Sequence, residues 1–437
     1  MKTLKTFSNW SGNLQFTPQS VNYPDSIEAI VALVDEARLA SKRVRLVGSG
    51  HSWMPLIETE DVLVSLDHWQ GVEAVDHDQQ TAVVRAGTKL SRLGQELFEH
   101  GVALANMGDI DVQSIAGAFF TGTHGTGTEH QILSSQLVAV TLVTADGQVL
   151  EWNEQDHPDE MNAVRVSFGA LGIVVKMEVK VQPAFKLEEL QYRQPLDQVF
   201  SNLETFKQSN RHFEFFWFPQ TENVVIKRVN VTDRPVLKPK KYMVFLEDRA
   251  LSRALKLAAR FPKMGRQINQ AVMALVDHET EGSADYAHLV FPSPRELRFN
   301  EMEYNIPAEH WKACFSEIVE LYSQPGFNVF FPIECRWVKG DDIWLSPAYQ
   351  RDSAYIAVHQ VAGSPYEEAF AQIEAIFRKY DGRPHWGKLN TMSREEAWET
   401  YPKLKDFAEL RDQLDPQGVF SNDYVSHMIG LGVPETA

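Results

Sequence analysis

The chain has 437 residues, of which 43% are hydrophobic and 23% are charged, and its formal net charge is −17. This length exceeds that of one ordinary hydrophobic core, so we expect a globular protein of two domains. The negative charge argues against nucleic acids and anionic membrane surfaces as partners.

Simple patterns exclude further classes of protein. Cys314 and Cys335 are the only cysteines and form no CxxC motif, which excludes a disulfide framework and a cysteine-rich zinc site. The first ten residues are polar and lack the apolar core of a signal peptide, and no apolar run has the roughly 18 residues of a membrane span. We therefore expect a cytoplasmic protein without membrane contacts, with a monomer as the simplest oligomeric state.

The first 182 residues predict short strands mixed with helices, without the regular βαβ alternation of a doubly wound fold. Apolar residues at helical or alternating spacing mark the elements. Asp25 and Glu28 form a predicted capping box at the first helix, and Gly101 is expected to end another. The expected helices are 27–37, 90–100 and 161–166, and the expected strands are 44–47, 62–66, 82–86, 137–143, 149–152 and 173–181.

From residue 187 onward the segments are longer, more aromatic and more charged. Helical spacing covers Ala250–Val276, with an interruption near Pro262–Gly265, and also Tyr366–Tyr380. The expected strands are 213–218, 224–228, 327–337, 343–345 and 355–361. We find no internal repeat, which argues against repeat architectures.

Two glycine-rich turns give the strongest functional signal. The first, Gly48–Ser52, follows a predicted strand, and the second covers Thr121–Gly127. Neither contains GxGxxG or GK[ST], so the standard nucleotide-binding motifs do not apply. One such turn is often only a sharp corner, but successive N–H groups can also bind phosphate. Two turns, each with hydroxyl groups and a histidine (His51 and His124), favour a large phosphate-bearing cofactor held at both.

Charged residues in apolar surroundings mark a second candidate site. Glu334 and Arg336 alternate in a strand-like run, so their side chains point to the same face. They form either an ordinary surface pair or a cavity-facing pair with a function, because burial of an idle ion pair is unfavourable. Lys388, close to His385 in a proline-bearing turn, either stabilises negative charge on a substrate oxygen or lies on a surface loop.

The histidines do not indicate a metal site. His51, His124 and His130 show neither HExxH nor close HxH spacing, and no carboxylate cluster accompanies them. We therefore expect no metal ion. A lone histidine such as His51 is otherwise typical of a packed core position.

Nine stretches spread over nearly the whole chain resemble the vanillyl-alcohol-oxidase superfamily of flavoproteins, and within it the aldonolactone oxidase and alditol oxidase group. They are Asn9–Asn13, Gly48–Ser52, Asn106–Gly117, Thr121–Gly125, Ser167–Gly172, Glu334–Arg336, Asp341–Pro347, Pro384–Lys388 and Asp415–Gly418. The resemblance implies an α+β, two-domain FAD-binding fold of the p-cresol methylhydroxylase (PCMH) type. It further implies an FAD-binding domain over 1–182, a substrate-binding cap domain on an antiparallel sheet over 183–390, and a segment 391–437 that returns to the FAD domain.

The cofactor implied by the resemblance is FAD, attached covalently through an imidazole nitrogen of His51 to the 8α-methyl carbon of the flavin. Ile173 would contact FAD through its backbone. The cofactor-binding residues implied in this way are Leu46, Val47, Gly48, Ser49, Gly50, His51, Ser52, Ser114, Gly117, Thr121, Gly122, Thr123, His124 and Ile173.

The resemblance also implies a substrate pocket in front of flavin N5. Its implied residues are Asp109, Glu334, Arg336, His359, His385 and Lys388. Lys388 and Arg336 would stabilise an incipient alkoxide, and Glu334 would bind substrate hydroxyls, while a hydride passes from the carbinol carbon to FAD. Reduced FAD would pass its electrons to O2 and yield hydrogen peroxide, because Gly108 leaves space for oxygen where some relatives carry a larger residue.

The implied substrate is a small sugar-derived carbinol. Asp109 and His359 stand where alditol oxidases carry serine and threonine, which favours an aldono-1,4-lactone of the L-gulono or D-arabinono type. The alternative substrate is an alditol such as xylitol or sorbitol, oxidised at the C1 hydroxyl. Two other classes remain open, a module that holds a nucleotide without turnover and a reductase that takes a hydride from NADPH. The charged residues argue against the first, and no residue demands the second.

Overall fold

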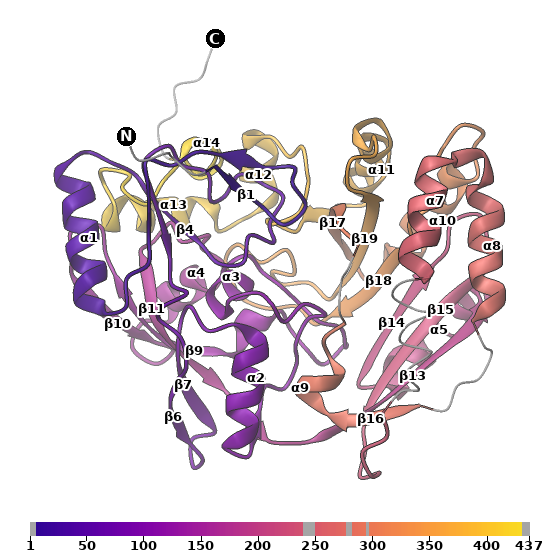
Figure 1. The fold of residues 1–437 in the computed structure, drawn as a ribbon, viewed down its shortest axis with the longest axis horizontal. Coiled ribbons are helices and arrows are strands. Elements are labelled where there is room, and N and C mark those ends of the chain that lie inside the picture. Colours follow the sequence, from indigo (N-terminus) through magenta and orange to yellow (C-terminus); the bar gives the residue numbers. More distant parts are fainter. Residues whose placement is uncertain (1–5, 239–249, 277–281, 294–296, 431–437) are drawn as a thin grey trace.

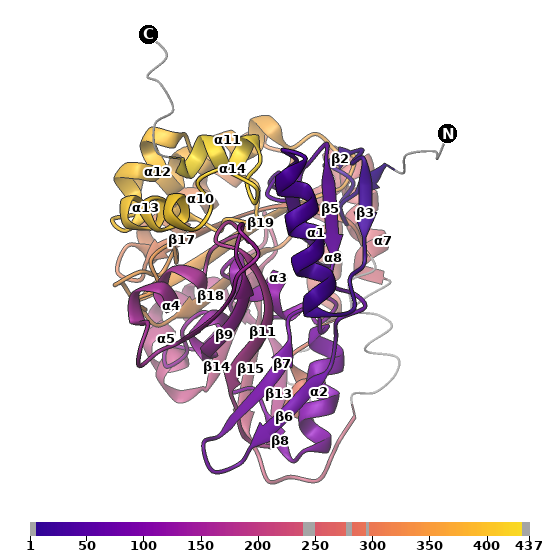
Figure 2. The same ribbon diagram turned by 90° about the vertical axis from the view of Figure 1, so that its left-hand side faces the viewer.

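A computed structural model describes residues 6–238, 250–276, 282–293 and 297–430 (Figure 1). The N-terminal elements and the C-terminal helices form one side of the molecule, and the middle of the chain forms the other around one large sheet. Figure 2 shows the same grouping from the side of the first helix.

The N-terminal side contains two main sheets. An antiparallel sheet has the order β10-β9-β11-β7-β6, and a parallel sheet has the order β3-β5-β4. The strands of the first are β6 (Val72–Asp76), β7 (Thr81–Arg85), β9 (Leu137–Val143), β10 (Val149–Asn153) and β11 (Ile173–Lys180). Those of the second are β3 (Ser20–Asn22), β4 (Val44–Val47) and β5 (Val62–Ser65), while β1 (Phe7–Ser8) pairs with β2 (Gln15–Phe16) and β8 (Val102–Ala103) with β12 (Gln182–Pro183).

An eight-stranded antiparallel sheet forms the other side, in the order β16-β13-β15-β14-β18-β19-β17-β20. Its strands are β13 (Lys186–Pro195), β14 (His212–Trp217), β15 (Asn223–Val231), β16 (Ser283–Tyr286), β17 (Phe299–Pro307), β18 (Ile333–Val338), β19 (Ser353–Val361) and β20 (Arg383–Pro384). One face of this sheet packs its apolar side chains against α5 (Leu196–Ser209), α10 (Trp311–Tyr322) and α11 (Glu367–Lys379). Because side chains alternate along a strand, the residues between these apolar ones point to the opposite face.

The remaining helices lie around both parts. They are α1 (Ile27–Leu39), α2 (Leu90–Glu99), α3 (Ile115–Phe120), η1 (Leu133–Gln136), α4 (Pro158–Val164), α7 (Leu251–Arg260), η3 (Pro262–Met264), α8 (Gly265–Leu275), α9 (Ala287–Val290), α12 (Arg394–Thr400), α13 (Leu404–Leu414) and α14 (Asp423–Ile429). The C-terminal segment returns to the N-terminal part, since Val44 N donates to Val419 O at 2.7 Å and Asn422 Nδ2 donates to Pro55 O at 2.7 Å.

Three local predictions were wrong. Ser26, not Asp25, caps α1, because its hydroxyl accepts from Ala29 N at 3.1 Å. The strand expected over 327–337 begins only at Ile333, directly after Pro332, which has no N–H for a ladder. The stretch 343–345 is a turn, because the Asp341 carboxylate accepts from Ile343 N at 3.0 Å and thereby closes it.

No helix in the described part of the chain is long and apolar enough to cross a membrane. The domain boundaries at residues 182 and 390 remain predictions, and residues 1–5 of the polar N-terminal segment lie outside the described residues.

Candidate active site

The two glycine-rich regions meet in one cleft. The first turn, Leu46–Ser52, forms one side of it, and Ser114, Gly117 and Thr121 form part of the other. The two sides pack closely, because a Cβ atom at Gly48 would lie 2.3 Å from the Ser114 hydroxyl oxygen. A side chain at position 48 would displace the Ser114 hydroxyl, which caps α3.

Free backbone donors make the first turn suited to an anionic group. Within the described ranges, no residue accepts a hydrogen bond from the N–H groups of Gly48, Ser49, Gly50 or His51. Gly50 has a φ of +66°, the left-handed conformation that lets successive N–H groups converge. The Lys89 ammonium lies 3.0 Å from the Ser49 hydroxyl and pairs with Asp67 at 2.7 Å, so its charge is already balanced within the cleft. These features fit the pyrophosphate of FAD.

His51 lies in the same cleft, at its junction with the charged residues of the large sheet. The ring is half-buried, stacks on Trp10 at 5.3 Å between centroids, and has Nδ1 3.1 Å from Ser49 O. Burial, together with the nearby Lys388 and Lys89, lowers the pKa of His51. A neutral imidazole at this position is a nucleophile rather than a cation.

Four residues predicted to bind the cofactor do not line this cleft. Gly122 and Thr123 follow the lining residue Thr121 but do not line the cleft themselves. Ile173 is fully buried between two lining residues, and His124 contacts Glu303 of the large sheet. The other ten predicted residues do line the cleft. The second glycine turn therefore contributes to two sites. Thr121 lines the cleft, and His124 faces the charged residues of the large sheet.

Two buried glutamates on β17, Glu301 and Glu303, form the centre of the charged face of the large sheet. Both are at most 5% exposed, and Met302 and Tyr304 between and after them point to the apolar core on the other face. Sequence reasoning missed both glutamates. The available signal was the alternation of acidic and apolar residues in Phe299–Pro307, which is also typical of a strand with one solvated face.

Glu301 joins two residues that were predicted to line the substrate pocket. One of its oxygens forms an ion pair with Lys388 Nζ, and the other lies 3.5 Å from His359 Nε2. Burial alone raises the pKa of Glu301, but Lys388 and His359 outweigh it and lower that pKa to about 2. Lys388 also lies 4.5 Å above the Trp53 ring, and Trp53 N donates to Gly387 O at 2.7 Å, which ties this turn to the His51 turn.

Glu303 faces two histidines. Its carboxylate lies 3.0 Å from His124 Nε2, whose ring stacks on Tyr355 with 3.6 Å between centroids. Burial raises the pKa of Glu303, but His124 and Lys388 outweigh burial and hold the pKa well below its usual range. Burial also lowers the pKa of His385 to about 4, so its ring is neutral near pH 7. Gly387 N donates to His385 Nδ1 at 3.0 Å, which leaves the ring proton on Nε2.

Arg336 binds three carboxylates on the same face. It contacts Glu214 and Glu334 at 2.6 Å each and Asp109 at 2.7 Å. The predicted pairing of Glu334 with Arg336 on one face of a strand is therefore confirmed. Burial alone lowers the pKa of Arg336, but Asp109, Glu334 and Glu214 outweigh it and raise that pKa well above its usual value.

Lys227 on β15 forms ion pairs with carboxylates of the same cluster. It lies 3.0 Å from Glu214, 3.5 Å from Glu189 and 3.7 Å from Asp109. Glu214 and Lys227 were not predicted from the sequence, because they lie on strands far from Arg336 along the chain. Asp109, Glu214 and Glu334 each bring an oxygen within 4.8 Å of the others, as metal ligands do, but the Arg336 guanidinium contacts all three.

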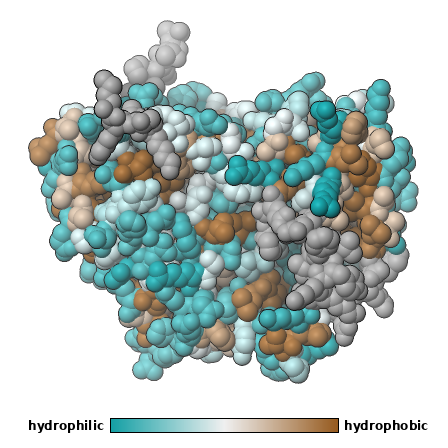
Figure 3. Space-filling model, viewed as in Figure 1, coloured by the Kyte–Doolittle hydropathy of each residue, from teal (hydrophilic) through white to brown (hydrophobic). Residues whose placement is uncertain are grey.

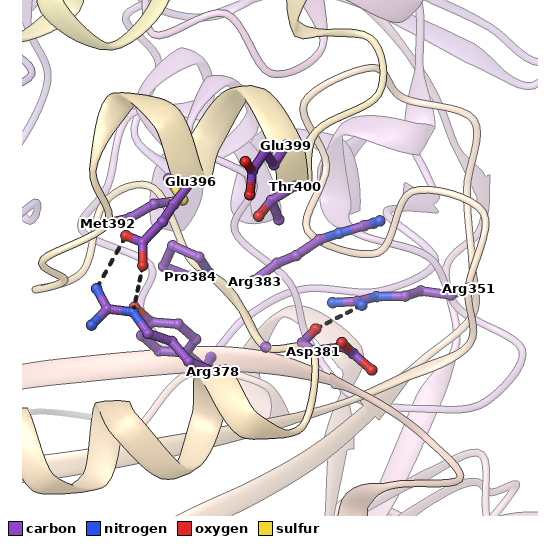
Figure 4. A pocket seen from close by; sticks show the side chains of 11 residues that line it. Arg351, Arg378, Asp381, Arg383, Pro384, Met392, Glu396, Glu399 and Thr400 are labelled. Carbon is purple, nitrogen blue, oxygen red and sulfur yellow. Dashed lines mark hydrogen bonds and ion pairs between the residues drawn. The ribbon is translucent and has the colours of Figure 1, made fainter.

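A separate cavity of about 360 Å³ lies near β20 and α12, and none of the predicted site residues lines it (Figure 4). Arg351, Arg378 and Arg383 extend toward it from different segments. Arg378 pairs with Glu396 at 3.2 Å, whereas Arg351 and Arg383 donate to backbone carbonyl oxygens of Asp381 and Tyr349. The arginines thus link β20 to the turns beside it.

The chain is similar to known flavoproteins and lactone-oxidising enzymes over nearly its whole length. Residues 177–428 match the family model of D-arabinono-1,4-lactone oxidase, and residues 18–153 match that of the FAD binding domain. L-gulono-1,4-lactone dehydrogenase of Mycobacterium tuberculosis is 37% identical over 97% of this chain and 99% of its own. L-gulonolactone oxidase of Mus musculus is 32% identical over 96% of this chain and 97% of its own.

A solved structure shows the same fold at low identity. Cholesterol oxidase from B. sterolicum superposes with a TM-score of 0.85 at 19% identity, over 98% of this chain and 97% of that one. The expected α+β fold, with an FAD-binding part and a cap built on an antiparallel sheet, is therefore confirmed.

Proposed function

Because the chain belongs to the D-arabinono-1,4-lactone oxidase family, we propose that it is an FAD-dependent oxidoreductase that oxidises a carbinol of an aldono-1,4-lactone of the L-gulono or D-arabinono type. The observation that carries this proposal is the charged face of the large sheet. There Arg336 and Lys388, each paired with buried carboxylates, lie next to the cleft that contains His51.

Bound FAD would supply the hydride acceptor for oxidation of the carbinol carbon. The N–H groups of Gly48–His51 hold the pyrophosphate, and Ser114, Gly117 and Thr121 complete the cleft. The His51 ring would hold the flavin covalently through a ring nitrogen. The support for this attachment is the position of the ring in the cleft and its lowered pKa, which leaves a neutral nitrogen available for bonding.

The charged residues bind and polarise the lactone. Glu334 and Asp109 accept hydrogen bonds from substrate hydroxyls, because an ionised carboxylate has acceptor oxygens and no donor. Arg336 and Lys388 stabilise the oxygen that becomes negative as its proton leaves. The neutral His385 ring donates from Nε2, and His359 fixes the other end of Glu301. Carboxylates and cations held in place by each other need little rearrangement during the reaction.

Molecular oxygen is the proposed electron acceptor, with hydrogen peroxide as product. Gly108 is buried, and a Cβ atom there would lie 3.1 Å from His124 O and 3.3 Å from Thr123 Cγ2. The backbone therefore packs closely at this point, and the support for oxygen as acceptor is the similarity to L-gulonolactone oxidase. The relatives include both a dehydrogenase and an oxidase, so the acceptor must be measured for this chain.

A peroxide-release assay tests the proposal. Purified protein is incubated in air with L-gulono-1,4-lactone, D-arabinono-1,4-lactone, xylitol or sorbitol. We expect peroxide with the lactones and much less with the alditols. Peroxide with xylitol but not with the lactones would indicate an alditol oxidase. Turnover that requires an added dye acceptor would indicate a dehydrogenase.

A further inference from the structure

A helical hairpin of the cap side, α7–α8 (residues 251–275), has an exposed surface that differs in charge from the rest of the molecule. Residues 250–276 contain five basic residues and no acidic one, although the whole chain has a net charge of −17. The rest of the chain therefore has a still larger negative excess. All five basic side chains are exposed: Arg253, Lys256, Arg260, Lys263 and Arg266.

Exposed apolar side chains lie among these cations. Leu257 is 45% exposed, Phe261 50%, Met264 52% and Leu275 77%. Figure 3 shows hydrophobic side chains next to hydrophilic ones over the part of the surface formed by α7 and α8 in Figure 1. Single exposed apolar residues are ordinary, but four of them on one short hairpin mark an interaction surface.

The opposite face of the hairpin explains why these side chains are exposed. Leu255, Ala258 and Met273 point inward and are at most 3% exposed. The fully buried Asn269 side chain donates to Pro219 O at 3.1 Å and Phe330 O at 3.0 Å. These contacts hold the hairpin on the cap, so its cationic and apolar face is directed outward.

None of the five basic side chains forms an ion pair with a carboxylate of the described residues. Exposed cations attract anionic lipid headgroups, and exposed apolar side chains beside them add to membrane binding when they enter the headgroup region. We propose that the α7–α8 hairpin docks this protein onto an anionic lipid surface, with Phe261 and Met264 entering the headgroup region and the cations facing lipid phosphates.

Two other occupants fit the surface less well. A second copy in a symmetric contact would bring the same five cations against each other. The core of a protein–protein interface is usually depleted of lysine, whereas this surface has a lysine beside its most apolar residues. The proposal departs from the expectation, drawn from the total charge, that the protein avoids anionic membranes. The positive charge is concentrated on the hairpin, and this uneven distribution would orient the hairpin toward the lipid.

Vesicle flotation with the full-length, flavin-loaded protein tests this inference independently of the catalysed reaction. Vesicles contain either equal parts of phosphatidylglycerol and phosphatidylcholine or phosphatidylcholine alone. We expect the protein to float only with the anionic vesicles and to dissociate in about 0.5 M salt, where charges on the surface are screened.

Two sets of substitutions locate the contact. Replacing Arg260, Lys263 and Arg266 by Gln is expected to lower partitioning on the order of a hundredfold, at roughly fivefold for each cation. Phe261→Ser combined with Met264→Ser is expected to lower it as well. The matched controls are Lys405→Gln on α13 and Leu39→Ser on α1, both exposed and remote in sequence from the hairpin. Flavin absorbance and the melting temperature show that each variant is folded.

Several results would overturn the inference. Folded wild-type protein that stays unbound with anionic vesicles excludes the lipid surface. Controls that lose binding as strongly as the hairpin variants exclude this location. Self-association in sedimentation velocity, abolished by the hairpin substitutions, would assign the surface to a second copy, and binding to soluble polyglutamate in place of vesicles would assign it to an acidic protein.

Discussion

Glu301 on β17 and His359 on β19 lie directly opposite each other in the antiparallel sheet, with 3.5 Å between Oε1 and Nε2. The second oxygen of Glu301 pairs with Lys388, so one buried carboxylate fixes two residues of the proposed substrate pocket. This arrangement makes Glu301 a positioning residue, and it leads to the first prediction.

Glu301→Gln is expected to lower kcat about a hundredfold while flavin binding is retained. The neutral amide no longer holds the Lys388 ammonium, and a small displacement of a catalytic group has an effect of this size. Steady-state kinetics with L-gulono-1,4-lactone measure it, with flavin content as the second readout. The matched control is Glu317→Gln, which removes the pair between Glu317 on α10 and Lys379 on α11. Equal kinetics for Glu301→Gln and wild type would exclude the positioning role.

Arg336→Lys is expected to lower kcat/KM at least about tenfold, although the charge is unchanged. A guanidinium can contact Asp109, Glu214 and Glu334 at once, whereas an ammonium has a different shape and reach. The variant should keep its flavin, because Arg336 does not line the cofactor cleft. Wild-type kinetics in this variant would show that only the charge matters.

The pH dependence of stability is expected to include a contribution from His385. Its pKa is lowered by burial from 6.5 to about 4, so between these values the unfolded chain binds a proton that the folded protein does not. Stability therefore falls as the pH decreases from about 6.5 to about 4, by on the order of 3 kcal/mol for this residue. Urea unfolding of wild type and His385→Asn across this range measures the effect.

The variant should show a shallower loss of stability over that range than wild type. His100→Asn, at an exposed position, is the matched control and should keep the wild-type slope. Identical slopes for wild type and His385→Asn would contradict a neutral, buried ring at position 385.

The closed lactone is expected to be a much better substrate than the aldonate formed by its hydrolysis. Glu301 and Glu303 are both held ionised in the pocket, and burial of a third carboxylate beside them is unfavourable. Initial rates with fresh lactone and with the same compound after alkaline hydrolysis make the comparison. Equal rates would show that the pocket accepts an anion and would exclude this reading of its electrostatics.

Much of the local structure was predictable, because the sequence patterns concerned are typical of a single kind of element. The strand Val44–Val47 running into a glycine turn, and the common face of Glu334 and Arg336, are both confirmed. Periodicity did not reveal Glu301 and Glu303, because acidic residues on alternate positions of a strand usually face water. Here both side chains are buried, Glu301 against Lys388 and Glu303 against His124. The strand predicted over Ile343–Leu345 was wrong, because the Asp341 side chain closes a turn there. The apolar residues of this stretch give no sign of that turn.

Pairings between distant segments were the least accessible to sequence reasoning. Lys227 and Glu214 come next to Arg336 only through the order of strands in the large sheet, and no local pattern encodes that order. The contact between His124 and Glu303 was also not predictable from the local sequence. The glycine-rich turn around His124 indicates a cofactor site, but the His124 ring faces Glu303.

Anaerobic mixing of the purified protein with L-gulono-1,4-lactone, followed by visible absorbance, is the most direct measurement of the central claim. We expect bleaching of the bound flavin, with the colour restored when air is admitted. A flavin that stays oxidised with every aldono-1,4-lactone but is bleached by NADPH or by xylitol would contradict the claim.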